Sequence, residues 1–195
     1  MDMLAYKLKA SDKKKVYARN AHIVRLDTQA ARDFLNKYHI QGFVPGTYYY
    51  GLKDDKGDIV AVSVWRKNAT SLYLDRYATS CSVVGGMGKM LKNTIKNHGD
   101  LFQEIVTFSD HCVSDGGLYE TLGFYRDREI RPDYCYIVNK ERVHKFNYRI
   151  QRFQRDDDLI FFPGLSESEL AKENNLYRLW DCGKTRWVKN LDKKC

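Results

Sequence analysis

A glycine-rich turn is the part of the chain best suited to hold an anionic ligand. Glycines let the backbone approach a ligand closely, and the N–H groups at a helix start point toward an anion. Leu91 and Ile95 follow at helical spacing, so a helix begins within the turn. We therefore expect a diphosphate to bind the backbone of this turn, which consists of Val84, Gly85, Gly86, Met87, Gly88 and Lys89. Neither the Walker A nor the Rossmann pattern of glycines is present.

Two titratable residues could move a proton. Asp110 ends the run EIVTFSD, and α/β sheets open to ligands where such strands end. Its carboxylate could accept a proton from an attacking amine, or it could cap the next helix. His39 titrates near neutrality and could be the base instead, or it could cap the end of a helix.

Two further side chains could position a substrate. Arg76 could hold a phosphate or a carboxylate, or it could form a surface salt bridge. Ser114 could hydrogen-bond the substrate or the donor, or it could cap a helix. The five cysteines show no CxxC spacing, so we expect free thiols and no metal site.

The elements around these residues alternate between strands and helices. Strands are predicted over 21–27, 71–78, 104–110 and 134–139, and a hairpin over 47–67 turns at residues 54–57. A helix capped by Asp27 or Thr28 follows the first strand, and another runs from the glycine-rich turn to Gly99. A short helix lies within 115–124, with Leu118 and Leu122 facing inward. This pattern predicts an α/β protein.

The last third of the chain is organised differently. A helix is predicted within 144–155, with Phe146, Ile150 and Phe153 on one stripe and Lys145, Arg149 and Arg152 on the next. A second helix is predicted over 165–174, and a hairpin over 176–189 turns at residues 182–183. We expect a basic leader over 1–20, a core over 21–139, and an appendage over 140–195 that packs on the main sheet.

Two motifs in the core resemble the GNAT superfamily of N-acetyltransferases. Residues 83–88 are similar to its pyrophosphate loop, Q/R-x-x-G-x-G/A, with Val83 in place of the initial Gln or Arg. Residues 118–124, LYETLGF, match its L-Y-x-x-L-G-F motif, and the resemblance covers roughly residues 20–138. It implies a mostly antiparallel sheet flanked by helices and acetyl-CoA or another acyl donor. It also implies that Tyr119 protonates the leaving thiolate.

A narrower resemblance is to small phage GNAT-like proteins of the Mom type, which modify DNA bases. It rests on His39, Arg76, Asp110 and the run LWDCG at 179–183. It implies acyl transfer to an amine on nucleic acid. One alternative is a small-molecule or protein N-acetyltransferase. The other is an inactive protein that binds nucleic acid or inhibits a host, and Val83 favours this inactive protein.

The charge distribution also favours an anionic partner. The net charge is +8, and residues 1–20, 139–155 and 184–195 together hold seventeen Lys or Arg and four acids. RNA, DNA and anionic lipid all fit such a surface. The phage resemblance favours DNA over RNA, and we expect Arg149 and Arg152 to contact the nucleic acid. Tyr48, Tyr49 and Tyr50 could stack a flipped base, or they could pack across strands. No export signal or long apolar run is present, which predicts a cytoplasmic protein.

Overall fold

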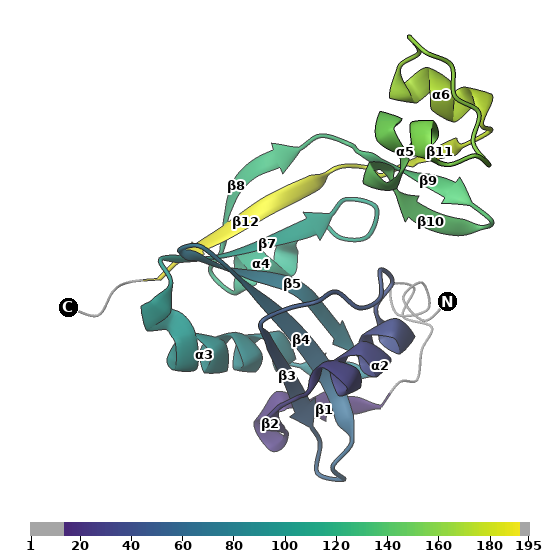
Figure 1. The fold of residues 1–195 in the computed structure, drawn as a ribbon. Helices are drawn as coiled ribbons and strands as arrows, with labels where there is room; N and C mark the ends of the chain where they lie inside the picture. The colour runs from purple at the N-terminus through teal and green to yellow at the C-terminus, as the bar shows by residue number, and fades with distance from the viewer. Residues whose placement is uncertain (1–13, 192–195) are drawn as a thin grey trace. The chain divides into compact units, whose positions relative to one another are not determined.

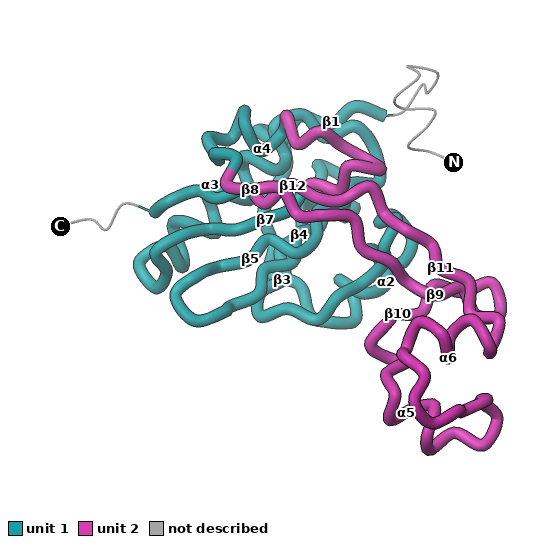
Figure 2. The backbone as a smooth tube through the Cα atoms, turned by 90° about the horizontal axis from the view of Figure 1, so that it is seen from above, with its two compact units in different colours: residues 1–108, 118–126, 187–195 teal, residues 109–117, 127–186 magenta. Residues whose placement is uncertain are grey.

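The computed structural model describes residues 14–191, which form two compact units. Unit 1 comprises residues 1–108, 118–126 and 187–195, as far as they are described, and unit 2 comprises residues 109–117 and 127–186 (Figure 2). The domain boundaries expected after residues 20 and 139 stay a prediction. Most of the expected basic leader lies outside the described residues.

The largest sheet has seven strands in the order β2-β3-β4-β5-β7-β12-β8 (Figure 1). Neighbours from β2 to β5 are antiparallel, whereas β5 and β7 are parallel. The predicted fold class, a mostly antiparallel mixed sheet flanked by helices, is confirmed. The strands are β2 (His22–Arg25), β3 (Tyr48–Lys53), β4 (Ile59–Asn68), β5 (Ser71–Thr79), β7 (Glu104–Asp110), β8 (Tyr125–Ile130) and β12 (Lys184–Asn190).

Two helices cover opposite faces of β3, β4 and β5. Helix α2 (Thr28–Tyr38) packs against Tyr49, whereas α3 (Gly86–His98) packs against Tyr50. Neighbouring residues of a strand point to opposite faces, so the two helices lie on different sides of the sheet. The predicted cap of α2 is confirmed, because the Asp27 carboxylate accepts the Ala30 N–H at 2.7 Å.

A β-bulge at Asp75 redirects the second half of β5. Val64 pairs with Arg76 and Trp65 with Leu74, which leaves Asp75 as the extra residue. Arg66 holds the Asp75 carboxylate through Nε at 2.6 Å and Nη2 at 3.0 Å. The bulge shifts the alternation by one residue, so Arg76 takes the α2 side of the sheet and Tyr77 the α3 side.

The ladder between β5 and β7 is short. It covers only Ser71–Tyr73 and Glu104–Val106, although β5 continues to Thr79 and β7 to Asp110. At its end, the Thr107 hydroxyl donates to the Leu74 carbonyl at 3.0 Å. Beyond this bond the pairing of the two strands stops, which leaves a stretch of β5 backbone outside the ladder.

Shorter elements complete unit 1. Strand β1 (Lys15–Tyr17) pairs in parallel with β6 (Ser82–Val84), and neither strand was predicted. Helix α4 (Gly117–Thr121) ends before Gly123, which has φ 76°. The prediction that Leu118 faces inward is wrong, because α4 is little more than one turn and turns Tyr119 toward the core; Leu118 is 47% exposed. The 3-10 turns are η1 (Ala18–Asn20) and η2 (Gly99–Leu101).

Unit 2 has a three-stranded antiparallel sheet and a core of its own. Strand β9 (Tyr134–Val138) lies between β10 (Glu141–His144) and β11 (Tyr177–Trp180). Helix α6 (Glu167–Glu173) begins with a capping box formed by Ser166 and Glu169. The core consists of Tyr136, Tyr148, Phe153, Leu170 and Ala171.

The single helix predicted over 144–155 is wrong. The segment divides into the 3-10 turn η3 (Lys145–Tyr148) and α5 (Ile150–Arg155), because Arg149 between them has an extended backbone, φ −78° and ψ 159°. The predicted apolar stripe is therefore broken. Phe153 is buried, whereas Phe146 is 57% exposed.

The predicted hairpin over 176–189 is also wrong. Strand β11 pairs with β9, whereas β12 belongs to the seven-stranded sheet. Residues 130–133 fix the connection: the Asp181 carboxylate accepts the Asp133 N–H at 2.8 Å, and Gly183 lies against the Ile130 carbonyl. These contacts hold residues 181–183 against residues 130–133, so this segment does not form the turn of a hairpin. Within residues 14–191, no helix has the length and apolarity needed to cross a membrane.

Candidate functional site

The glycine-rich turn begins α3 as predicted, but its glycines have different roles. Gly85 has φ 75°, a left-handed conformation that favours glycine, and it occupies the N-cap. Gly86 faces the protein: a Cβ there would lie 2.6 Å from the Tyr77 hydroxyl and 2.8 Å from Val83 Cγ1. A Cβ on Gly88 would meet only Leu122 Cδ2, at 3.3 Å. Gly88 is therefore the more open of the two helical glycines.

Two groups at the helix start already have protein partners. Lys89 Nζ donates to the carbonyls of Ala18 at 2.9 Å and Ala21 at 2.5 Å. The Tyr77 hydroxyl accepts the Met87 N–H, and burial raises the pKa of this phenol. Lys89 is one of the six residues predicted to bind the donor, but its ammonium group is directed at the backbone of η1 and of the residue after it. The first-turn N–H groups of Gly86 and Gly88 lack an intrahelical acceptor, as at any helix start.

Tyr119 belongs to a buried hydroxyl network. Its hydroxyl is hydrogen-bonded to Thr107, whose own proton goes to the Leu74 carbonyl, so the phenol donates to the threonine oxygen. The ring packs against Phe124 and Trp187, with centroids 5.8 and 6.1 Å away. Burial raises the pKa of Tyr119, so the phenol is protonated at neutral pH. The hydroxyl of Tyr119 thus lies beside the end of the β5–β7 ladder.

Arg76 and His39 come together on the α2 side of the sheet. Arg76 Nε donates to the Gly42 carbonyl at 3.2 Å and its Nη1 to the Asp75 carbonyl at 2.8 Å. His39 is the C-cap of α2, and its Nδ1 accepts the Gln41 N–H at 3.1 Å. The remaining ring proton is therefore on Nε2. To act as a base at Nδ1, His39 would first have to release Gln41.

His39 gives unit 1 a pH-dependent stability. Burial, and then the charge of Arg76, lowers the pKa of His39 from 6.5 to about 4. Between these values the unfolded chain binds a proton that the folded chain does not, so the free energy of unfolding falls as pH drops from 6.5 to 4. We expect a loss of about 1–3 kcal/mol, discounted for partial exposure of the ring.

Urea unfolding of the wild type and of His39→Gln at several pH values measures this contribution. The glutamine cannot titrate, so the difference between the two curves should change over pH 4–6.5 and be constant above it. A constant difference throughout would contradict the lowered pKa.

Asp110 and Ser114 belong to unit 2, where both organise backbone. The Asp110 carboxylate accepts the Cys112 N–H at 3.0 Å, and its carbonyl accepts the Ser114 N–H at 2.8 Å. Ser114 Oγ accepts the Gly116 N–H at 3.1 Å, before α4 begins. These bonds hold a turn after β7 and the loop before α4, whereas the alternatives placed both residues at helix starts. The catalytic role of Asp110 and the binding role of Ser114 stay predictions.

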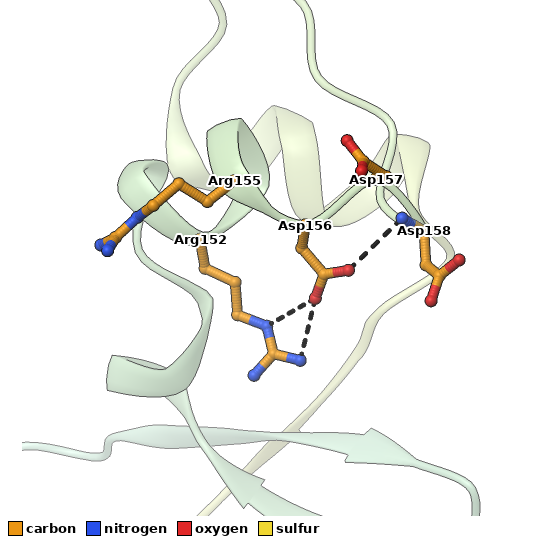
Figure 3. A pocket seen from close by; sticks show the side chains of 5 residues that line it. All are labelled: Arg152, Arg155, Asp156, Asp157 and Asp158. Carbon is orange, nitrogen blue, oxygen red and sulfur yellow. Dashed lines mark hydrogen bonds and ion pairs between the residues drawn. The ribbon is translucent and has the colours of Figure 1, made fainter.

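Arg149 and Arg152 are paired with carboxylates inside unit 2. Arg149 lies 3.6 Å from Glu167, and Arg152 forms an ion pair with Asp156 at 3.1 Å. Arg152 and Asp156 line an open hollow of about 660 Å³, in which Arg155 points away from Asp156 (Figure 3). The other lining residues are Asp157 and Asp158. With three carboxylates beside two guanidinium groups, this hollow has no excess of positive charge for an anion.

Comparison with solved structures identifies the fold. The fold is that of the GNAT acetyltransferases. A Bacillus subtilis acetyltransferase in complex with CoA has a TM-score of 0.53 at 11% identity, covering 88% of this chain and 99% of that one. The ribosomal-protein-S18-alanine N-acetyltransferase of Escherichia coli has a TM-score of 0.52 at 12% identity, covering 90% and 96%. No protein-family model and no curated protein matches the sequence.

The prediction of a nucleic-acid partner is wrong. Among the solved structures with this fold, the Escherichia coli enzyme is named for an alanine of a ribosomal protein. The side chains expected to contact DNA, Arg149 and Arg152, are paired with Glu167 and Asp156. The tyrosines expected to stack a base pack internally: Tyr50 bonds His98 at 2.7 Å, and Tyr48 stacks on the same ring at 3.9 Å.

Three residues of the site were missed from the sequence. Thr107 and Tyr77 look like ordinary strand residues, and Asp75 looks like an exposed strand carboxylate. A signal exists for Asp75 alone: the pair Arg66 and Asp75 flanks a hairpin, and an acid within a strand is typical of a bulge or an ion pair. Thr107 and Tyr77 become visible only through their hydrogen bonds in the fold.

Proposed function

We propose that this protein transfers an acyl group from an acyl-CoA donor to an amine of a small molecule or a protein. The observation that carries the proposal is the early end of the β5–β7 ladder, with the Tyr119–Thr107 network at that end. Backbone groups of β5 beyond Leu74 are outside the ladder and can bind an extended, amide-containing chain such as the pantetheine arm.

The start of α3 fits the anionic half of the same donor. Gly85, at its left-handed φ, opens the helix without a side chain, and Gly88 leaves space beside the first turn. First-turn N–H groups and the positive end of the helix dipole favour a diphosphate. The acetyltransferase from Bacillus subtilis, which shares the fold, was solved with CoA.

The Tyr119 phenol would supply the proton that the leaving sulfur needs. The amine nitrogen attacks the thioester carbon, the C–N bond forms, the C–S bond breaks, and the thiolate accepts the phenol proton. The Thr107 hydroxyl can turn from the Leu74 carbonyl to the phenolate oxygen and stabilise it. Arg76 and His39 position the loop after α2. The amine releases its proton to solvent, and the expected roles of Asp110 and His39 as bases stay predictions, as does the phage resemblance.

Direct assays of donor binding and transfer test the proposal. Isothermal calorimetry should show binding of acetyl-CoA, and thiol release should depend on an added amine; a panel of polyamine, amino-acid amide and N-terminal alanine peptide samples the acceptor classes. Mass spectrometry of each amine identifies the product. Binding without transfer to any amine would favour a protein that retained the fold and lost catalysis. Absence of donor binding would contradict the proposal and favour the inactive protein that Val83 in the loop suggests.

A further inference from the structure

The β1–β6 ladder carries a cationic cluster beside the start of α3. Lys15 pairs with Ser82, Val16 with Val83, and Tyr17 with Val84. Because side chains alternate along a strand, Val16 and Val83 enter the core while Lys15 and Tyr17 occupy the other face. Tyr17 is 41% exposed. Its partner Val84 directly precedes Gly85, so the ring lies next to the glycine-rich turn.

Two cations gather around this ring. Lys15 Nζ lies 5.4 Å and Arg19 Cζ 5.2 Å from the centroid of Tyr17. Within the part of the chain that the structure describes, neither cation forms an ion pair with a carboxylate. We call Lys15, Tyr17 and Arg19 the Tyr17 cluster. It combines one ammonium group and one guanidinium group with an aromatic ring that holds the two cations close together.

Three contacts fix the backbone under the cluster. Lys14, which directly precedes β1, forms an ion pair with the buried carboxylate of Asp54. Val16 and Ala18 belong to the core. Lys89 of α3 donates to the carbonyls of Ala18 and Ala21, which bracket η1. The backbone under the Tyr17 cluster is thereby fixed to the start of α3. Binding a ligand through a preorganised cation costs less entropy than binding it through a mobile one.

The glycine-rich turn has no cation of its own that is directed at a ligand. Lys89 bonds η1 and its flanks, and Val83 packs in the core. Cationic side chains beside a helix start strengthen the binding of a diphosphate there. We propose that Lys15 and Arg19, held by Tyr17, bind a phosphate group of the acyl-CoA donor. This inference rests on the proposed function and assigns to that site a phosphate contact from β1 and η1.

Three ligands separate the phosphates of the donor. CoA carries the diphosphate and the 3′-phosphate, 3′-dephospho-CoA carries the diphosphate alone, and pantetheine carries neither. The variant is Lys15→Gln with Arg19→Gln, which removes both charges from exposed positions. The matched control is Arg32→Gln with Lys37→Gln on α2, where an arginine and a lysine also lie over aromatic rings, at 4.3 and 5.1 Å.

We expect the cluster variant to bind CoA about tenfold or more weakly, the range of charge-assisted contacts to phosphate. Pantetheine binding should be unchanged, and the control variant should bind all three ligands as the wild type does. A loss for CoA alone places the contact on the 3′-phosphate, and an equal loss for 3′-dephospho-CoA places it on the diphosphate; both support the inference.

Three outcomes overturn it. Unchanged CoA affinity in the cluster variant, or an equal loss in the control variant, would leave the Tyr17 cluster without a specific role. Wild-type protein that binds none of the three ligands would contradict the proposed function and, with it, this inference. Thermal unfolding of both variants checks folding, since all four substituted side chains are exposed.

Discussion

Replacing Tyr119 by phenylalanine is expected to lower kcat for acyl transfer about 10²-fold or more, the usual effect of removing a general acid. Only the hydroxyl is lost, and the ring keeps its packing against Phe124 and Trp187. Thr107 keeps its bond to the Leu74 carbonyl, so the free energy of unfolding should change by about 1 kcal/mol at most. KM for the donor should change little.

Thr107→Val provides the matched control, since it removes the partner hydroxyl and retains the shape of the side chain. Tyr119 and Thr107 belong to one network, so the double variant should be little slower than Tyr119→Phe alone. Steady-state kinetics with acetyl-CoA and the best amine measure all three variants. A Tyr119→Phe enzyme with wild-type kcat would exclude the hydroxyl from the chemistry.

Gly86→Ala is expected to destabilise the fold by about 1–3 kcal/mol, the usual cost of overfilling a packed site. Its Cβ would overlap the Tyr77 hydroxyl at 2.6 Å and Val83 Cγ1 at 2.8 Å. Tyr77 cannot move freely, because its hydroxyl accepts the Met87 N–H. Loss of donor binding in such a variant would therefore report on folding.

Gly88→Ala lies two residues further along the same helix and serves as the control. Its Cβ meets only the end of the Leu122 side chain, and alanine is favoured over glycine in a helix by about 1 kcal/mol. Urea unfolding should show Gly88→Ala to be as stable as the wild type or more so. Equal stability of Gly86→Ala and the wild type would contradict the packing described for Gly86.

Much of unit 1 could be predicted from local patterns. The helix capped by Asp27, the hairpin around residues 54–57 and the helix that begins after Gly85 each depend on signals within a few residues. The motif around Tyr119 indicated its short helix in the same way. Local hydrogen bonds and side-chain periodicity determine these elements, so a short stretch of sequence contains their cause.

Features that depend on distant partners could not be predicted. The periodicity of residues 144–155 favours one helix, but the extended backbone of Arg149 divides the segment. Strand β11 pairs with β9 across forty residues instead of with its neighbour β12. The bond of Lys89 to Ala18 and Ala21 likewise depends on the position of η1. Neither composition nor spacing contains such tertiary contacts.

Hydrogen–deuterium exchange with and without acetyl-CoA tests the central claim, that an acyl-CoA donor binds along β5 and at the start of α3. The predicted result is slower amide exchange in peptides that cover Leu74–Thr79 and residues 84–89, with little change in β2. CoA should reproduce this protection and pantetheine should protect β5 alone. Unchanged exchange in both regions at saturating acetyl-CoA would contradict the account.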